Sequence, residues 1–518
     1  MGASVAEIAL INASIQHDPE LAWDLWQTLP HADDDLRNGY SDYAWSAPTS
    51  DNKRVVRRAL SSIPQIASCR DYVLVGSAPI FSYLAACRQA VPDNRIPVCG
   101  LVHSVWTSNL FGTYNWIRQC FQPHDVLVAT SQASLAALRT VLDTLDDNAP
   151  RMRSGGPPSR PRLEQIPLGV HVPSANELGR DAARSILEIP NDAFVILYMG
   201  RLSEKYKADL EPLLNGVAYL LDRGKKVRLL LAGQASDLEY NAQLERYIHI
   251  LGISHVTLRF ENFAEFLKSV FLSACNVGVF PVDSIQESFG LAILETMAHA
   301  RPVIASDWSG YRDLILHGAT GFLIPSRWSP SIAKSAGIFA GIDSTVTVAH
   351  NAAQGLALDV GDLVRYLEWL MENPDAASDM GLAGQQHVAA RYSWKVVAAQ
   401  FRMLWEEQLG IASAQNFPPQ NQLAGLDLIF NSYPSSLLSE TDWLIRSPLA
   451  ASDIVVNAVL SYIRNAQTLI LIRAVLRDLE ERPISLAEAK ARGLREANII
   501  FLAKKGLCRL IDEIGAKT

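Results

Sequence analysis

The sequence lacks the features that mark several other protein classes. None of its six cysteines stands in a C-x2-C pair, so the pattern indicates neither a zinc site nor a disulfide framework. No apolar run approaches the roughly 20 residues that a membrane-spanning helix needs. The first residues show no basic segment followed by an apolar run, as a signal peptide would. From these absences we expect a cytoplasmic protein.

Basic residues are fewer than acidic ones, 46 against 54. The formal net charge of −8 argues against bulk binding to nucleic acid, so no nucleic-acid partner is expected. Hydrophobic residues make up 49% of the chain, which is enough for large cores. A length of 518 residues leaves room for two or three domains.

An alternation of short apolar runs and helical segments begins at residue 72 and predicts an α/β fold. Glycine or serine follows several of the predicted strands, where ligands of open α/β sheets bind. The expected strands are 72–75, 96–102, 125–129, 166–170, 194–199, 227–232, 255–260, 277–281, 302–305 and 321–324.

The most informative stretch is 287–325, ESFGLAILETMAHARPVIASDWSGYRDLILHGATGFLIP. Gly290 permits a tight turn, and the apolar spacing of 291–300 predicts a helix between two buried strands, which is a βαβ unit. The free N–H groups at the start of that helix form a ready anion site. Two carboxylates, Glu287 and Glu295, frame the turn with seven residues between them.

This E-x7-E pattern, with the SFGL turn and the segments DWSGYRDL and GATGFLIP, resembles the donor-binding core of family-4 retaining glycosyltransferases. The resemblance spans about residues 70–409 and implies the GT-B fold, in which two Rossmann-like domains face each other across a cleft. It implies an acceptor-side domain over 1–172 and a donor-side domain over 173–410. A helical extension over 425–518 lies beyond it.

The resemblance also implies the donor site. Glu287 would contact sugar hydroxyls and Glu295 the ribose, while backbone N–H groups of the turn would meet sugar and phosphates. The donor-binding residues implied beside Glu295 are Gly200, Ser288, Phe289, Gly290 and Leu291.

Two cations are expected to hold the donor diphosphate in the loop that follows strand 194–199. Arg201 matches the family pattern directly, and spacing favours Lys207 over Lys205. A helix N-terminus supplies only about half a positive charge. Two cations would complete the neutralisation, and arginine can fork across two oxygens.

His103, at the end of strand 96–102 in LVHSVWT, is the best match for the family histidine that lies over the donor sugar. The alternative is a polar residue that closes the strand, with Trp106 packed against it. The sequence shows no Gly-rich loop before Gly76, whereas family members usually open with a strand and such a loop.

No metal site is expected. The acidic run 33–35 follows Pro30 and His31 rather than a strand, so it reads as a solvated loop and not as metal-binding carboxylates. The expected reaction needs no cofactor, because its substrate is itself a UDP- or GDP-sugar.

Two further segments leave their roles open. Loop 151–162 carries four arginines, which are either solvated or meet an anionic acceptor or lipid in a peripheral membrane contact. The tail predicts one helix over 454–479, a second after the capping box 485–488 and a third over 496–511. It would serve docking, self-association or acceptor recruitment, and its removal after Gly410 should leave both lobes folded.

The function expected from these features is a retaining, metal-independent transfer of a hexose-type sugar from a nucleotide-diphosphate sugar to an unidentified acceptor. The alternatives are a catalytically silent nucleotide-sugar-binding or scaffold partner and, less favoured, a GT-B epimerase or phosphorylase.

Overall fold

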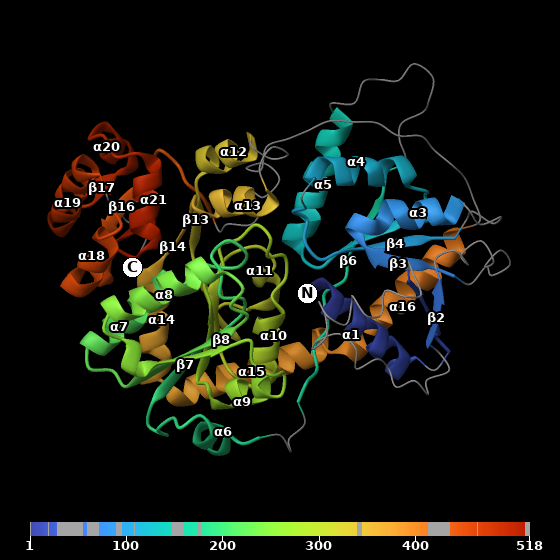
Figure 1. The fold of residues 1–518 in the computed structure, drawn as a ribbon, viewed down its shortest axis with the longest axis horizontal. Helices are drawn as coiled ribbons and strands as arrows, with labels where there is room; N and C mark the ends of the chain where they lie inside the picture. The colour runs from blue at the N-terminus through green and yellow to red at the C-terminus, as the bar shows by residue number, and fades with distance from the viewer. Residues whose placement is uncertain are drawn as a thin grey trace. The chain divides into compact units, whose positions relative to one another are not determined.

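The computed structural model describes residues 2–18, 20–27, 55–59, 72–89, 96–107, 109–147, 160–173, 178–338, 344–412, 436–463 and 465–512. The chain divides into two compact units. Unit 1 comprises Met1–His171 and Ala390–Ala424, and unit 2 comprises Val172–Ala389 and Gly425–Thr518. Each unit is built on a parallel sheet with helices packed against it (Figure 1), so the α/β prediction is confirmed.

Unit 1 contains a four-stranded parallel sheet in the order β3-β4-β5-β6 and a separate parallel pair, β1-β2. Its strands are β1 Trp23–Gln27, β2 Val55–Ala59, β3 Leu74–Ser77, β4 Val98–Val102, β5 Val126–Ala129 and β6 Arg162–Gln165. Its helices are α1 Gly2–His17, η2 Ala78–Ile80, α3 Phe81–Gln89, α4 Leu110–Cys120, α5 Gln132–Asp147 and α16 Trp394–Ile411.

The core of unit 1 joins segments from both ends of the chain. Leu10 of α1 and Phe401 of α16 pack with Leu101 of β4 and Val128 of β5. Helices α1 and α16 thus cover one face of the sheet, with α3 and α4 on the other (Figure 1). Helix α16 therefore completes unit 1, although it follows most of unit 2 in the sequence.

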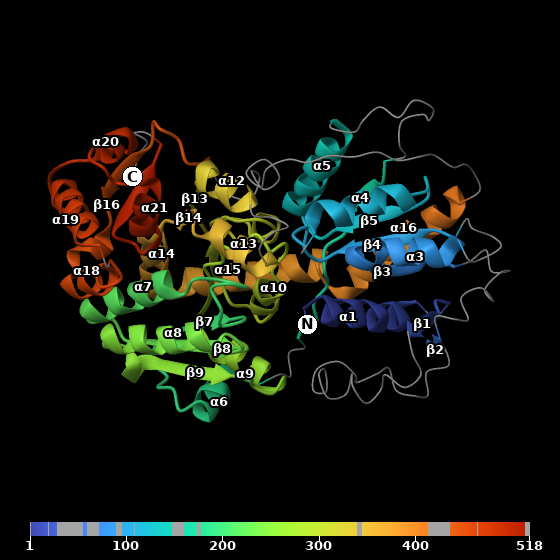
Figure 2. The same ribbon diagram turned by 45° about the horizontal axis from the view of Figure 1, so that its top comes forward.

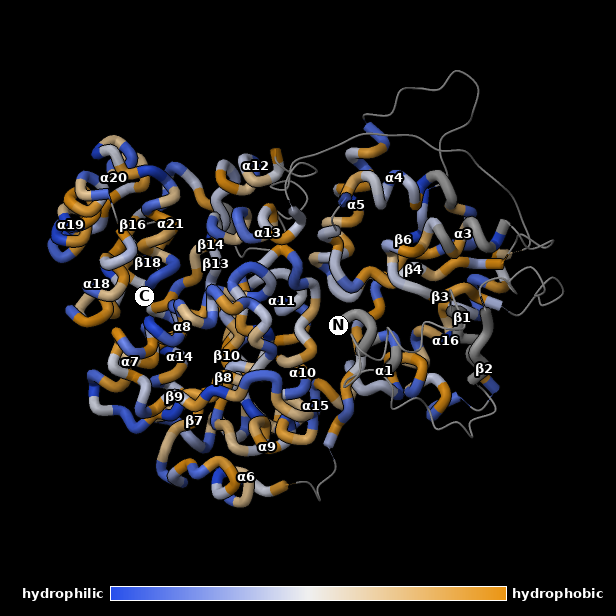
Figure 3. The backbone as a smooth tube through the Cα atoms, in the orientation of Figure 1, coloured by the Kyte–Doolittle hydropathy of each residue, from blue (hydrophilic) through white to orange (hydrophobic). Residues whose placement is uncertain are grey.

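Unit 2 contains a six-stranded parallel sheet in the order β12-β11-β10-β7-β8-β9. Figure 3 shows that hydrophobic segments gather along these strands, as expected for strands buried on both faces. The strands are β7 Phe194–Met199, β8 Val227–Gly233, β9 Thr257–Glu261, β10 Val277–Phe280, β11 Val303–Ser306 and β12 Gly321–Ile324. The helices around them are α6 Arg180–Ile186, α7 Glu211–Asp222, α8 Leu238–Ile250, η3 Ser254–Val256, α9 Leu267–Ala274, α10 Leu291–Ala298, α11 Tyr311–Leu314, α14 Val360–Glu372 and α15 Pro374–Arg391.

The strand order reverses between β7 and β10. From β7 the chain runs outward through β8 to β9, and it then returns to the other side of β7 and continues through β10, β11 and β12. Because such crossovers are right-handed, the helices of the two directions cover opposite faces of the sheet. Ligands of open α/β sheets bind beyond the strand ends at such a reversal. Loops 200–210 and 281–290 follow β7 and β10 there.

Residues 326–358 form a small substructure beside the main sheet of unit 2. Strand β13 (Ser326–Trp328) pairs antiparallel with β14 (Leu356–Leu358), and β15 (Ser436–Leu437) pairs parallel with β13. Helices α12 (Pro330–Ile338) and α13 (Thr345–Ala353) fill the connection.

The C-terminal segment, defined here as residues 436–512, is not purely helical and belongs to unit 2. Strand β16 pairs antiparallel with β17 and β18. Helix α18 lies beside α7 in both Figure 1 and Figure 2, and α21 packs against β14. The elements are β16 Trp443–Arg446, η4 Pro448–Ala451, α18 Asp453–Leu460, α19 Ala466–Glu481, β17 Ile484–Ser485, α20 Leu486–Ala491, α21 Glu496–Lys504 and β18 Cys508–Ile511.

Two helix predictions in this segment were wrong in extent and one was right. The helix expected over 454–479 is two helices, because Asn465 caps a new start by accepting a bond from the Thr468 N–H at 2.9 Å. The helix expected over 496–511 ends early, where Gly506 takes a φ of +79°. The Ser485 cap of α20 is confirmed by its bond from the Glu488 N–H.

Candidate functional site

The two loops at the strand reversal meet through an ion pair. Lys207, in the loop after β7, contacts a carboxylate oxygen of Glu287, in the loop after β10. The Tyr311 hydroxyl donates to the same carboxylate at 3.4 Å, and the Phe289 N–H donates to its other oxygen at 3.4 Å. The Glu287 side chain is 11% exposed and Lys207 20%, so solvent still reaches the pair.

Charge at this pair is set by two opposing effects. Burial disfavours the ionised carboxylate of Glu287, but the neighbouring Lys207 more than offsets it and holds the Glu287 pKa below its usual range. Glu287 is therefore an acceptor of hydrogen bonds at neutral pH. Burial, with Glu287 alongside, raises the pKa of Tyr311 well above its ordinary value, so Tyr311 remains a donor.

The turn after Glu287 requires glycine. Gly290 has a φ of +117°, which side-chain-bearing residues rarely adopt, and an added Cβ would lie 2.5 Å from the ring of Tyr311. Helix α10 begins directly after it, and the Ile293 N–H returns to the Gly290 carbonyl at 3.1 Å. Ser288, in the loop before this turn, is buried, and Leu291, the first residue of α10, is half-buried. The first N–H groups of a helix have no partner within the helix itself.

The structure separates the two candidate lysines. Lys205 pairs with Glu239 of α8 at 3.2 Å, away from Glu287, whereas Lys207 contacts Glu287. Arg201 is exposed and lies over the Tyr206 ring, 5.4 Å from its centroid. The site therefore offers Lys207 and an accessible guanidinium on one loop.

A close approach of the chain to the Gly200 carbonyl explains a second glycine, Gly233. A Cβ on Gly233, at the end of β8, would lie 1.7 Å from the Gly200 carbonyl oxygen. The glycine that closes β8 thus lets the loop after β7 run tightly beside it. The sequence signal for Gly233 was present, as a glycine at the end of a predicted strand.

Glu295 has a partner that the sequence did not reveal. Its carboxylate lies 2.8 Å from the ammonium nitrogen of Lys268 on α9, and the Glu295 side chain is half-buried. Burial lowers the pKa of Lys268, but the carboxylates of Glu295 and Glu265 together outweigh this and raise it above its ordinary value. No local pattern links residues so far apart in sequence.

His103 lies in unit 1, directly after β4, as its strand prediction required. Its Nε2 is 3.4 Å from a carboxylate oxygen of Glu7 on α1, and its side chain is largely buried. Trp106 is buried nearby in sequence. The role of His103 over a donor sugar stays a prediction.

No group of three or more histidine, cysteine, aspartate or glutamate side chains able to hold a metal occurs in the described part of the chain. Cys99, Cys275 and Cys508 are buried as free thiols. The acidic run 33–35 lies outside the described residues. Metal independence stays a prediction.

The arginine-rich loop is described only from Arg160 onward. Arg160 pairs with Asp143 and Asp146, and Arg162 pairs with Glu164 and Glu407 at 2.7 Å. Both arginines thus have carboxylate partners within unit 1. Among the described helices, none is long and apolar enough to cross a membrane.

Comparison with solved structures defines the fold class. A glycosyltransferase from Rickettsia africae superposes with a TM-score of 0.55 at 14% identity, covering 79% of this chain and 95% of its own. Anabaena HepE, solved in complex with UDP, gives 0.53 at 16% identity, covering 79% and 96%. The fold is GT-B, with two Rossmann-like units.

The sequence comparisons point to the same class of protein over part of the chain. The model of glycosyl transferases group 1 matches residues 193–337, the segment that carries Arg201, Lys207 and both glutamates. Over that segment the chain is similar to this family, as the motif resemblance predicted.

Curated relatives match part of the chain. A D-inositol 3-phosphate glycosyltransferase from Geodermatophilus obscurus is 32% identical over 219 residues, which are 40% of this chain and 46% of the relative. A phosphatidyl-myo-inositol mannosyltransferase from Mycobacterium leprae is 23% identical over 312 residues, or 60% and 67%. The chain thus spans less than half the length of the first of these relatives.

Proposed function

We propose that the protein is a retaining glycosyltransferase that moves a hexose-type sugar from a UDP- or GDP-sugar to an acceptor hydroxyl without a metal ion. The observation that carries the proposal is the contact of Lys207 with Glu287 at the point where the strand order of unit 2 reverses. That contact places a cation and an ionised carboxylate side by side, next to the turn of Gly290 and the start of α10.

Each feature suits one part of a nucleotide-sugar donor. The exposed guanidinium of Arg201, the ammonium of Lys207 and the first N–H groups of α10 favour a diphosphate. Glu287, held ionised, accepts hydrogen bonds from sugar hydroxyls. Glu295, half-exposed on the second turn of α10, would accept from the ribose.

The proposed transfer keeps the configuration of the donor. The departing diphosphate oxygen takes the proton of the acceptor hydroxyl on the face from which it leaves, while the sugar-to-phosphate bond breaks and the bond to the acceptor oxygen forms. The protein positions the donor and stabilises the charge that develops on the diphosphate. The inositol-based substrates in the names of the two relatives make a phosphorylated cyclitol the first acceptor to try.

The test is a panel of UDP- and GDP-sugars incubated with the purified chain, with and without EDTA. Slow donor hydrolysis, or transfer to an added acceptor, should proceed at comparable rate in chelator and release a product with the anomeric configuration of the donor. Loss of turnover in EDTA with recovery on magnesium or manganese would refute the metal-free reaction. An inverted anomer would refute retention.

A catalytically silent nucleotide-sugar-binding partner is the second candidate, favoured by the absence of a Gly-rich loop before Gly76. It predicts nucleotide binding without hydrolysis or transfer for every donor in the panel. Epimer formation without release of sugar would instead indicate the GT-B epimerase class.

A further inference from the structure

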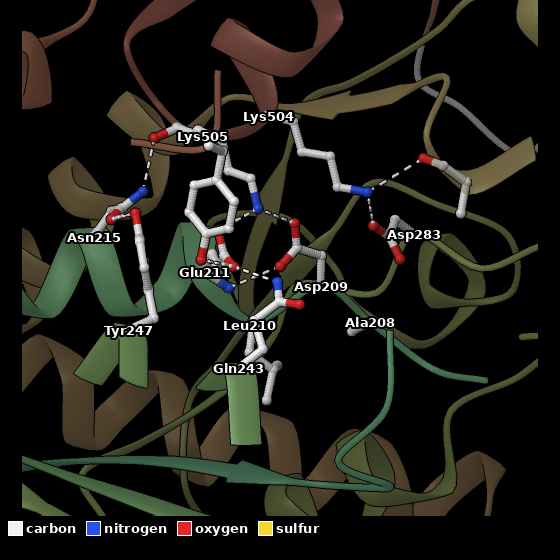
Figure 4. A network of polar contacts seen from close by, with 12 residues as sticks. Ala208, Asp209, Leu210, Glu211, Asn215, Gln243, Tyr247, Asp283, Lys504 and Lys505 are labelled. Atoms are coloured by element: carbon white, nitrogen blue, oxygen red, sulfur yellow. Dashed lines mark hydrogen bonds and ion pairs between the residues drawn. The ribbon is translucent and has the colours of Figure 1, made fainter. Parts of the chain in front are cut away.

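Two successive lysines of the C-terminal segment contact the loops after β7 and β10. These loops, 200–210 and 281–290, are called the donor loops below. Lys504 is the last residue of α21, and Lys505 follows it as the C-cap. The Lys505 ammonium lies 2.6 Å from Asp209 and 2.5 Å from Glu211, and Lys504 pairs with Asp283 (Figure 4). All five side chains are at least nine-tenths buried, so water screens these pairs little.

The positions of the three carboxylates in the sequence show which loop each lysine contacts. Asp209 stands two residues after Lys207, and Asp283 stands four residues before Glu287. Lys505 therefore holds the end of the loop after β7, while Lys504 holds the start of the loop after β10. The same two loops also contact each other directly, through the ion pair of Lys207 and Glu287.

Further bonds make the Lys505 anchor specific. The Lys505 carbonyl accepts from the Asn215 amide at 2.9 Å, and Tyr462 of the C-terminal segment donates to Glu211 at 2.9 Å. Lys505 and Lys504 together hold the pKa of Asp209 below its usual range even though burial opposes this. An unpaired carboxylate at this depth would be costly, so the loop and the segment order each other.

We propose that Lys504 and Lys505 are positioning residues of the donor site, through which the C-terminal segment sets the placement of loops 200–210 and 281–290. They do not touch the donor. Their effect on nucleotide affinity rests on the proposed function, whereas their effect on the two loops does not.

Arg509 provides a matched control. It belongs to the same segment and pairs with Asp359 at 2.6 Å and with Asp362 at 3.2 Å, two carboxylates that are also buried. Those residues lie at the start of α14, outside both donor loops. Arg509→Met should thus remove a pairing with two buried carboxylates of unit 2 without moving the donor site.

The experiment compares Lys504→Met, Lys505→Met and Arg509→Met with the wild-type chain by amide hydrogen exchange without ligand. The Glu287 amide, bonded to the Ser284 carbonyl at 3.1 Å, should exchange faster in Lys504→Met. The Ala208 amide, bonded to the Ser203 carbonyl at 3.1 Å, should exchange faster in Lys505→Met. Arg509→Met should change neither.

A second measurement gives the affinity for UDP and GDP by calorimetry. Both lysine variants should bind about 2- to 30-fold more weakly than wild type, the range for residues that act on a site without contacting its ligand. Arg509→Met should bind as wild type does. Where a single lysine variant does not fold, Lys504→Met with Asp283→Asn removes both charges and is used in its place.

Unchanged exchange at Glu287 and Ala208 in the lysine variants would overturn the positioning role. Equal acceleration in Arg509→Met, or wild-type nucleotide affinity in both lysine variants, would overturn it as well. A wild-type chain that binds neither nucleotide would refute the proposed function and leave the exchange result as the measure of the positioning role.

Discussion

At the scale of single residues, the candidate site depends on how charges are paired. Glu287 and Glu295 are alike in type and only seven residues separate them, yet one faces Lys207 across two loops and the other faces Lys268 on α9. Each carboxylate thus has its own cation. Arg201 has no carboxylate partner among the described residues, which leaves its charge for an anionic ligand.

Arg201→Ala should weaken nucleoside diphosphate binding roughly 10- to 100-fold, since a charge-assisted contact contributes about 1.5–3 kcal/mol. Calorimetry with UDP and GDP measures this. Arg223→Ala is the matched control, because Arg223 also lies 5.4 Å from a tyrosine ring centroid but stands after α7, outside the site. Equal affinity of Arg201→Ala and wild type would remove Arg201 from the site.

Glu204, in the same loop as Arg201, should make the stability of the protein depend on pH. Burial, and then the nearby Asp209, raise the pKa of Glu204 from 4.5 to about 7, although Lys504 and Lys505 oppose this. A carboxyl whose pKa is raised by folding destabilises the folded state when it ionises. The cost is absent below pH 4.5, grows as the pH rises and is complete above about 7.

Glu204→Gln should therefore leave the free energy of unfolding unchanged at pH 4 and increase it at pH 8, by up to about 3 kcal/mol. Urea unfolding at the two pH values tests this. A variant that is less stable than wild type at pH 8 would contradict the assigned direction of the pKa shift.

At the scale of elements, the turn between β10 and α10 is the part of the site most sensitive to backbone change. Gly290 has a positive φ, and the ring of Tyr311 lies close to the position that an added Cβ would take. A side chain at 290 would therefore cause both backbone strain and a clash. The turn positions Glu287 on one side and the start of α10 on the other.

Gly290→Ala should lower both thermal stability and nucleotide affinity, with a strain cost on the order of 1–3 kcal/mol. Gly252→Ala is the control, because Gly252 has a φ of +70° with open space around its Cα and stands after α8. It should lower stability alone. Wild-type nucleotide affinity in Gly290→Ala would separate this turn from the donor site.

At the scale of the whole molecule, the C-terminal segment is part of unit 2. Arg509 pairs with Asp359, and Lys504 and Lys505 pair with carboxylates of the donor loops. The sequence led us to expect intact lobes after removal of this tail, and the buried pairs predict the opposite.

A chain ending after Ile411 should be much less stable in unit 2 than one ending after Asp512, since each buried pair that loses one partner costs about 3–5 kcal/mol. Urea unfolding followed by the fluorescence of Trp308 and Trp328, both buried in unit 2, measures the difference. Equal midpoints for the two chains would show that the segment contributes no stability.

The sequence by itself determined the α/β class, most strands of both sheets and the turn at Gly290. These features follow from local periodicity and from the backbone freedom of glycine, so neighbouring residues suffice to predict them. The E-x7-E spacing and the position of Arg201 were equally readable, because each is a local pattern within one segment.

Only the tertiary structure decided which charges meet. Spacing favoured Lys207 over Lys205, but the contact with Glu287 exists because β7 and β10 lie side by side in the sheet. Lys268 likewise contacts Glu295, and Lys505 contacts Asp209 across 296 residues, because the elements that carry them pack together. Pairings between distant segments depend on the packing of the elements that carry them, and no periodicity within either segment encodes that packing.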